Sequence, residues 1–183
     1  RAGSYQIEVL AKSKEHEVPI TLRFQELRDE QMQPAHGELP FFLQENTVIQ
    51  FLQYPYEQVV AENFVEILEK MELINDLSCY EEIYGILKKE ALDGRKVEQQ
   101  IIEIGTKREL FFGKDRLDTV LHYKDYTYMK RKWTAYLKRE RKKEPDWVEV
   151  MTLLEAFFPP VWRAIIRDEI FIGDWMPELC RFL

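Results

Sequence analysis

The sequence is poor in glycine and cysteine, and it contains no long apolar run. Its 7 glycines are scattered, so it has no glycine-rich loop of the kind that cradles nucleotide phosphates. Its 2 cysteines, Cys79 and Cys180, form neither a disulfide framework nor a metal-spaced cluster. No segment approaches the roughly eighteen apolar residues of a membrane span, and none has the features of a signal peptide. These absences argue against a disulfide-rich secreted protein and against a membrane partner, and they favour a cytoplasmic location.

Histidine is equally scarce. His16, His36 and His122 are the only 3 in the chain, and they lie far apart in polar surroundings. This spacing predicts neither a metal site nor a catalytic triad. Cys79 has no histidine near it in the sequence, which favours a small buried hydrophobic side chain over a nucleophile.

Aromatic residues, by contrast, are plentiful. The chain has 11 phenylalanines, 9 tyrosines and 4 tryptophans in 183 residues, which is enough for a sizeable core and argues against disorder. The net charge of −7 argues against a surface that binds nucleic acid everywhere, but it leaves room for a local basic patch. The chain begins at Arg1 rather than at methionine, so we expect it to be part of something longer.

The first fifty or so residues have the pattern of β-structure. Residues 5–11 and 18–24 carry apolar side chains at every second position, which predicts a β-hairpin with one packed face. Pro19 near the start of the second segment indicates an edge strand. Residues 25–39 are polar and contain proline and glycine, which predicts an exposed loop. The apolar run at 48–52 predicts a further strand.

From residue 55 onward the apolar spacing changes to three and four residues, which is typical of helices. Two helices are expected within 55–89. Further helices are expected over 97–105, 123–143, 147–158, 161–170 and 174–183, whereas 106–120 shows no clear pattern. Pro159 and Pro160 should end the helix that precedes them.

These patterns predict an α+β fold, mainly α, in which a small N-terminal antiparallel β element is followed by a multi-helix bundle. The expected division is a β-rich part with a flexible loop at 1–54 and a helical domain at 55–183. One core is expected in the helical domain, with these members: Val60, Phe64, Ile67, Leu68, Ile83, Leu87, Trp133 and Trp147.

One expected helix contains Ala61-Glu62-Asn63 followed by Lys70, and the next one carries Cys79 and Glu82, three positions apart. This arrangement resembles the AbiEii/AbiGii family of nucleotidyltransferase toxins. In that family a helix opens with an Ala-Glu-Lys step, a basic residue follows seven positions later, and a helix with an Asp-x-x-Asp pattern comes next. Asparagine thus replaces the lysine, and the acidic pair has changed. The similarity continues in the expected helix that contains Trp133 and in the expected helix from Trp147 to Phe158, which is followed by Pro159 and Pro160.

The resemblance implies transfer of a nucleotide from an NTP to an RNA such as transfer RNA, with Mg²⁺, and an antitoxin protein as partner. It also implies that 1–54 is the remnant of a nucleotidyltransferase-like sheet. Thr21 and Arg23 stand where a metal-binding acid would be wanted, so the chain itself indicates no metal ligands. Asn63, Lys70 and Glu82 are the candidate nucleotide-binding residues that the resemblance suggests.

Two of these assignments have a simpler alternative. Lys70 could be a solvated lysine paired with Glu66 or Glu69. Glu81 and Glu82 could be residual metal or base positions, but a solvated helix face is the simpler interpretation of both.

The segment 130–143, KRKWTAYLKRERKK, has the strongest local charge. It holds eight basic residues and one acid in a chain of charge −7, so it could follow the phosphates of RNA. The candidate RNA-binding residues are Lys130, Arg131, Lys132, Lys138, Arg139, Arg141 and Lys142. Alternatively, the segment is a solvated face whose charges favour the C-terminal end of the helix dipole.

Two functions therefore remain open. The first is the helical half, or a degenerate member, of an AbiEii-like nucleotidyltransferase toxin. The second is a non-catalytic module that binds RNA or another protein.

Overall fold

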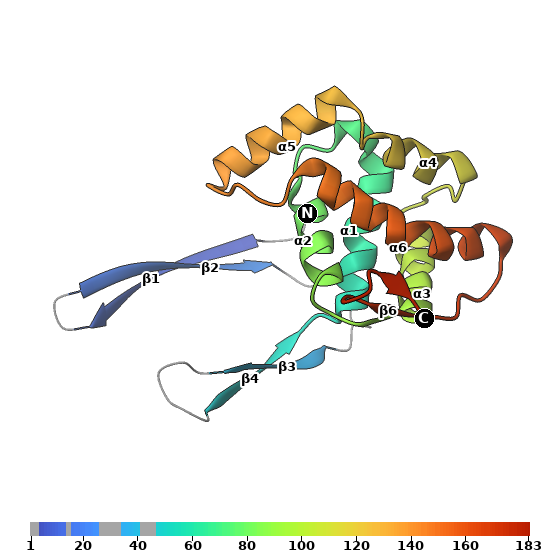
Figure 1. The fold of residues 1–183 in the computed structure, drawn as a ribbon. Helices are drawn as coiled ribbons and strands as arrows, with labels where there is room; N and C mark the ends of the chain where they lie inside the picture. Colours follow the sequence, from blue (N-terminus) through green and yellow to red (C-terminus); the bar gives the residue numbers. More distant parts are fainter. Residues whose placement is uncertain (1–3, 14–15, 26–33, 41–46) are drawn as a thin grey trace. The chain divides into compact units, whose positions relative to one another are not determined.

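The computed structural model describes residues 4–13, 16–25, 34–40 and 47–183, and these form two compact units, Arg1–Gln53 and Tyr54–Leu183. Strand pairs make up the first unit and helices dominate the second (Figure 1), which confirms the predicted α+β, mainly α, fold. None of the helices in the described ranges has the length and apolar character that crossing a membrane would require.

The first unit contains the predicted hairpin. Strands β1 (Ser4–Ser13) and β2 (His16–Gln25) pair antiparallel, with Val9 opposite Ile20. Because side chains alternate along a strand, the aliphatic residues gather on one face. Val9 and Ile20 on that face are 42% and 43% exposed, and Ile7, Val18 and Leu22 are exposed as well, so this face is not packed as predicted.

A second strand pair corrects the loop predicted at 25–39. Strand β3 (Ala35–Pro40) pairs antiparallel with β4 (Val48–Gln53), so the end of the predicted loop is a strand, while the strand predicted at 48–52 is confirmed. Gly37 lies opposite Phe51, and a Cβ at Gly37 would come within 2.5 Å of the Phe51 ring. The glycine that suggested a loop instead makes room for an aromatic ring across the strand pair.

The second unit is built on α1 (Tyr56–Lys70), which packs against α2 (Ser78–Leu87) and α3 (Gly94–Lys107). A short 3₁₀ turn, η1 (Met71–Leu73), follows α1. All eight predicted core residues are buried, and they belong to one continuous cluster. Phe64 is at its centre, with its ring stacked on Phe158 at a centroid distance of 3.6 Å.

Residues 106–120, which had no clear pattern, contain most of a helix. Helix α4 (Lys114–His122) is only 9 residues long, and within it only Leu117 and Val120 are buried, so its apolar periodicity is too short to detect. The helix predicted over 123–143 is shorter than expected, because residues 123–125 form turns and α5 spans Thr127–Arg139.

Pro159 and Pro160 do not end the helix that contains them. Helix α6 (Trp147–Arg167) continues through both prolines, and it also replaces the short helix predicted at 161–170. Residues on both sides of the prolines, Phe158, Val161 and Trp162 among them, are at most 3% exposed. We infer that this continuous burial offsets the roughly 3 kcal/mol that a proline costs inside a helix.

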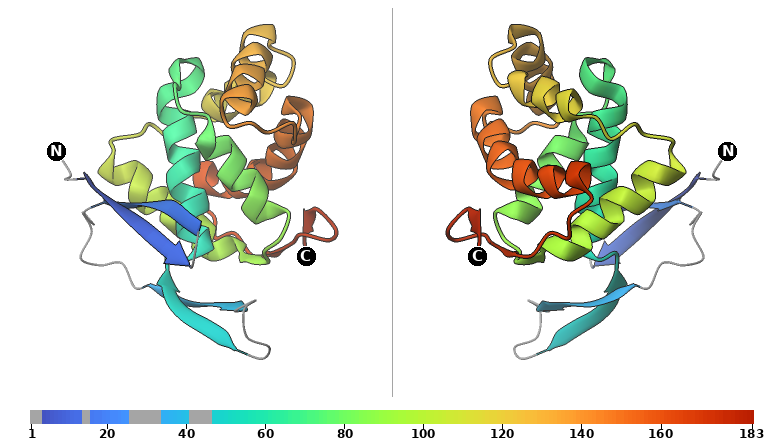
Figure 2. Two further views of the ribbon diagram at one scale, coloured as in Figure 1. Left: turned by 90° about the vertical axis from the view of Figure 1, so that its left-hand side faces the viewer. Right: turned by 90° about the vertical axis from the view of Figure 1, so that its right-hand side faces the viewer.

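The helix predicted at 174–183 is wrong. Strands β6 (Asp174–Met176) and β7 (Arg181–Phe182) lie there, in the red segment next to the C-terminus in Figure 2. Strand β6 also pairs antiparallel with β5 (Leu92–Asp93), directly before α3. Trp175 is fully buried and donates from Nε1 to the Leu87 carbonyl at 2.8 Å. A Cβ at Gly94 would lie 2.5 Å from the Gly173 carbonyl, so glycine permits this close approach.

Candidate nucleic-acid interface

Helix α5 owes its position to two tryptophans. Its inward face buries Met129, Trp133, Tyr136 and Leu137. Trp133 donates from Nε1 to the Pro145 carbonyl at 2.9 Å, and Trp147 donates from Nε1 to the Tyr123 carbonyl at 2.8 Å. The two indole rings are 5.7 Å apart. These contacts fix both the start of α5 and the loop that leaves it, so the outward face of the helix has a defined orientation.

The end of α5 turns back on itself. Arg141 has a left-handed backbone, with φ 56°. The Lys142 amide donates to the Leu137 carbonyl at 2.8 Å, and the Arg141 amide donates to the Lys138 carbonyl at 3.2 Å. This pair of hydrogen bonds is a Schellman motif, which satisfies carbonyls at the end of a helix. The motif keeps the basic residues after α5 close to its last turn.

Four of the predicted RNA-binding residues are occupied by contacts within the protein. Lys132 donates from Nζ to the backbone carbonyls of Glu72, at 3.1 Å, and of Ile74. The other three form the ion pairs Lys142–Glu81 at 2.5 Å, Arg139–Glu140 at 2.9 Å and Lys130–Asp125 at 3.7 Å. Lys132 therefore anchors the turn after α1, which sequence patterns could not indicate.

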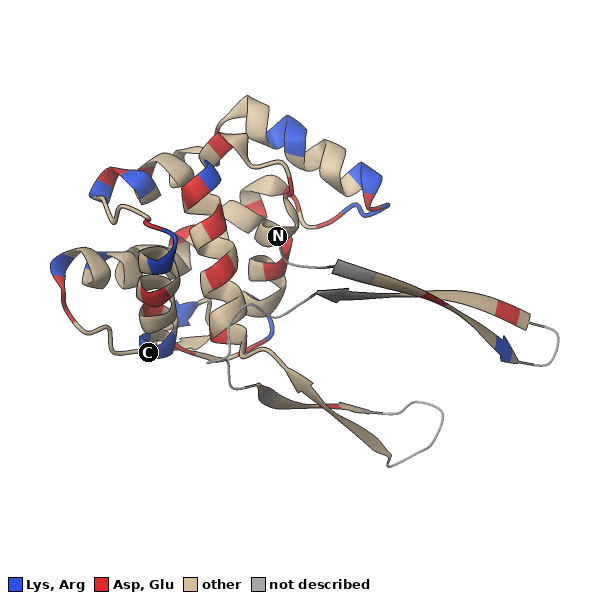
Figure 3. Ribbon diagram, turned by 180° about the vertical axis from the view of Figure 1, so that it is seen from behind, with Lys and Arg blue, Asp and Glu red and all other residues tan. Residues whose placement is uncertain are grey.

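The remaining basic residues of the segment are exposed and have no ion-pair partner among the described residues. They are Arg131, Lys138, Arg141 and Lys143, and we call them the α5 basic surface. Arg131 and Lys138 are seven residues apart, which places them about two turns apart on one side of the helix. Figure 3 shows Lys and Arg on α5 and on the loop after it, whereas α1 carries mainly acidic residues.

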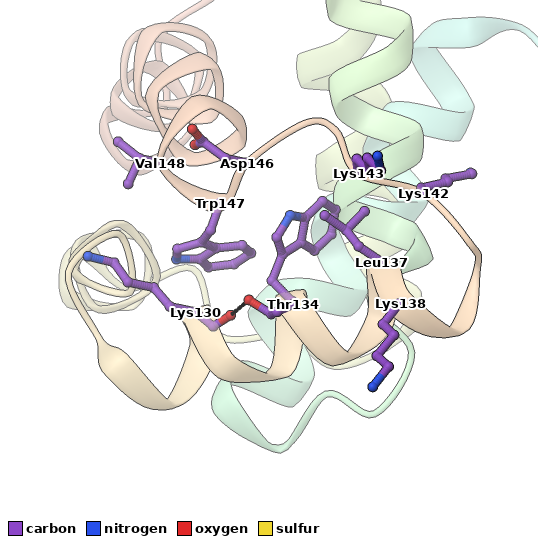
Figure 4. A pocket seen from close by; sticks show the side chains of 10 residues that line it. Lys130, Thr134, Leu137, Lys138, Lys142, Lys143, Asp146, Trp147 and Val148 are labelled. Carbon is purple, nitrogen blue, oxygen red and sulfur yellow. Dashed lines mark hydrogen bonds between the residues drawn. The ribbon is translucent and has the colours of Figure 1, made fainter.

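A pocket of about 540 Å³ adjoins this surface where α5, the loop and α6 meet (Figure 4). Trp133, Leu137 and Trp147 give it an apolar wall. Its polar lining consists of Lys130, Thr134, Lys138, Lys142, Lys143 and Asp146. The pocket therefore combines an apolar wall with an excess of positive charge, which suits a negatively charged ligand with an apolar part.

The three candidate nucleotide-binding residues are only partly brought together. Asn63 donates from Nδ2 to Glu82 Oε2 at 2.9 Å, which joins α1 to α2. Lys70 instead pairs with Glu66 at 2.7 Å, and this hydrogen bond raises the pKa of Lys70. Two helical turns separate Lys70 from Asn63, about 10 Å along the axis.

The residues present do not fit a Mg²⁺ site. Across the described ranges no three His, Cys, Asp or Glu side chains gather as a ligand set. Glu82 has its carboxylate engaged with an amide. We therefore derive no chemical step through a metal ion.

Cys79 behaves as a core residue. It is buried, and its Sγ donates to the Asp76 carbonyl at 3.3 Å. Burial raises the pKa of the Cys79 thiol to about 12, so the thiol is neutral at physiological pH and a weak nucleophile.

Glu81 fixes the loop after α5 onto α2. Its carboxylate accepts hydrogen bonds from the Tyr136 hydroxyl and from Lys142 Nζ, each at 2.5 Å. Burial alone would raise the pKa of Glu81, but these two hydrogen bonds outweigh burial and lower it. Sequence reasoning treated Glu81 as a solvated residue, because its partners lie more than fifty positions away.

Replacing Glu81 with glutamine should lower the free energy of unfolding by about 1 kcal/mol at pH 7, since a half-exposed lysine loses its charged acceptor. A carboxyl group whose folded pKa is depressed stabilises above its unfolded pKa, near 4.3, and loses this contribution as the pH falls. The difference between wild type and variant should therefore shrink between about pH 5 and pH 3. Urea titrations across this range measure it.

The matched control for this experiment is Glu178→Gln, because Glu178 is exposed and has no hydrogen-bond or ion-pair partner in the described residues. The control should change stability by less than about 0.5 kcal/mol at every pH. A constant difference between wild type and the Glu81 variant down to pH 3 would contradict the assigned ionic role.

No family model, curated protein or solved structure matches this chain.

Proposed function

We propose that the helical unit binds RNA through the α5 basic surface. This proposal rests on the observation that the basic residues of the 130–143 segment fall into two groups, one with partners in the protein and one without. Half of these cations are occupied by contacts within the protein, whereas Arg131, Lys138, Arg141 and Lys143 are exposed and have no ion-pair partner among the described residues. In a chain of net charge −7, such a concentration of unpaired cations attracts a polyanion to one place.

The spacing of these cations favours a polymer over a small anion. Arg131 and Lys138 are about 10 Å apart along the helix axis, and the other two follow on the loop. A single phosphate cannot reach all four, but the repeated phosphates of a nucleic acid can. RNA is the form of nucleic acid that the family resemblance implies, and transfer RNA is the acceptor it implies.

The dependence of binding on salt tests the proposal quantitatively. Each neutralised phosphate contributes roughly −0.7 to −0.9 to the slope of log K against log salt. Four free cations therefore predict a slope of roughly −3 to −4. Fluorescence anisotropy with labelled transfer RNA, at salt concentrations from about 50 to about 200 mM, measures this slope.

Other slopes have distinct meanings. A slope of roughly −6 to −7 would show that all eight basic residues reach phosphates, which would contradict the division described above. No measurable binding at low salt would refute RNA binding by this unit and leave protein interaction as the alternative.

Nucleotide transfer, with Mg²⁺ and an NTP, stays a prediction from the resemblance, and so does an antitoxin partner. The Asn63–Glu82 contact is compatible with a structural link between α1 and α2 and does not require a nucleotide. We therefore place RNA binding first.

A further inference from the structure

Two tyrosines at the start of α5 are exposed, unlike the other aromatic residues of this helix. Tyr126 precedes the helix and Tyr128 lies in its first turn, and they are 48% and 49% exposed. Trp133 and Tyr136, further along, are 1% and 7% exposed. Two half-exposed rings side by side, with centroids 5.9 Å apart, are more than the isolated apolar residue that any surface carries.

Both rings are held in place by the protein. Tyr126 lies 6.0 Å from the ring of Tyr123, whose hydroxyl donates to Glu72 at 2.7 Å. The ammonium group of Lys132 is 5.3 Å from the Tyr128 ring centroid and is itself fixed by backbone carbonyls. Each ring therefore has a fixed neighbour, while each of the two tyrosine residues is about half exposed.

Tyr128 lies beside the α5 basic surface, and Tyr126 packs against Tyr128. Tyr128 and Arg131 are three residues apart on the helix, which makes them direct neighbours, with Cβ atoms about 5–6 Å apart. Lys138 lies ten residues beyond Tyr128, about 15 Å along the axis. An RNA strand that runs along α5 from its N-terminal end would contact the aromatic rings first and the basic side chains next.

We infer that the bound RNA is single-stranded, with unpaired bases stacked on Tyr126 and Tyr128 and phosphates extending toward Lys138. This inference rests on the proposed function. Bases inside a duplex stack on each other and present only their edges, so an exposed ring can stack only on an unpaired or terminal base. Stacking of this kind tolerates any base, because every base has an aromatic face.

The test compares a labelled single-stranded RNA of twelve nucleotides, a length chosen for the assay, with a blunt duplex of the same sequence. The double variant Tyr126→Leu with Tyr128→Leu should bind the single strand at least roughly thirtyfold more weakly, since it removes two stacked bases that each contribute about 1–3 kcal/mol. Affinity for the duplex should fall much less, because only its two terminal base pairs present an open face to the rings. The Tyr126→Phe with Tyr128→Phe variant keeps both rings and should bind like wild type.

A spectroscopic signal separates stacking from an indirect loss of structure. Fluorescence of 2-aminopurine placed within the single strand should be quenched by wild type and by the phenylalanine variant, but not by the leucine variant. As a matched control, Phe111→Leu changes a ring that is 76% exposed elsewhere in the unit, and it should have no effect on either RNA.

The outcomes distinguish the two proposals. Equal affinity for single strand and duplex, with no effect of the leucine variant, overturns the stacking inference and leaves RNA binding intact. Binding of neither RNA overturns both.

Discussion

Charge reversal of the α5 basic surface, with all four of its cations changed to glutamate, is expected to weaken RNA binding by roughly a hundredfold or more. Non-specific affinity for nucleic acid arises almost entirely from phosphate contacts, and the variant replaces each attraction with a repulsion. The fold should tolerate the change, because these side chains are exposed and have no partner in the described residues. Anisotropy measurements at low salt compare the two proteins.

Lys132 is deliberately excluded from this variant. Its ammonium group donates to the carbonyls of Glu72 and Ile74, so a glutamate there would place a carboxylate against two backbone oxygens. A variant that includes Lys132 would confuse loss of binding with loss of structure. Arg141 can be included, because the left-handed backbone at this position is about equally unfavourable for glutamate and for arginine.

A control with the same change in net charge isolates the effect of position. Four exposed cations away from α5 can be reversed together: Lys89, Arg95, Arg163 and Arg181. This control should retain RNA affinity within a few-fold. An equal loss in both variants would mean that overall charge, and not the α5 basic surface, governs binding.

Truncation of Phe64 to alanine should lower the free energy of unfolding by about 3–5 kcal/mol. Phe64 is 1% exposed, and its ring is stacked nearly parallel on the Phe158 ring. It is nearly perpendicular to the Trp162 ring, and the centroids of these two rings are 5.8 Å apart. Since a domain of this size is typically stable by only about 5–15 kcal/mol, the variant should be close to unfolding. Urea denaturation followed by tryptophan fluorescence measures the change.

Phe111→Ala provides the opposite case, because the Phe111 ring is 76% exposed. Its removal should alter stability by less than about 0.5 kcal/mol. If Phe64→Ala fails to fold, Phe64→Leu keeps most of the buried area and should show a smaller but measurable loss. A negligible effect of both Phe64 substitutions would contradict the central position of this ring.

The parts of the fold that could be predicted are those whose signal is local and long. Phe64 and Trp133 were expected in the core because apolar residues recur at helical spacing around them, and both are buried. The β1–β2 hairpin was visible because alternation continues over each strand. Helix α4 was missed because it is short, and the strand at Asp174–Met176 was missed because its partner, Leu92–Asp93, is distant in the chain.

The proline pair shows how tertiary packing overrides a local rule. Pro159 and Pro160 disfavour a helix, but the apolar residues on either side share one buried face. The basic segment shows the same limit for function. Its composition was evident, but Lys142 and Lys132 are occupied by Glu81 and by the carbonyls after α1, and nothing local in the sequence identifies these two partners.

Because of the Schellman motif at the end of α5, the α5 basic surface cannot be reproduced by a short peptide. Helix α5 has 13 residues, and an isolated helix of that length is only marginally stable in water. A synthetic fragment covering 127–143 would lack the Pro145 carbonyl that holds Trp133 and the helix that supplies Trp147. A graft of the α5 basic surface onto another protein would therefore also have to include the turn after α5 and the packing around Trp133 and Trp147.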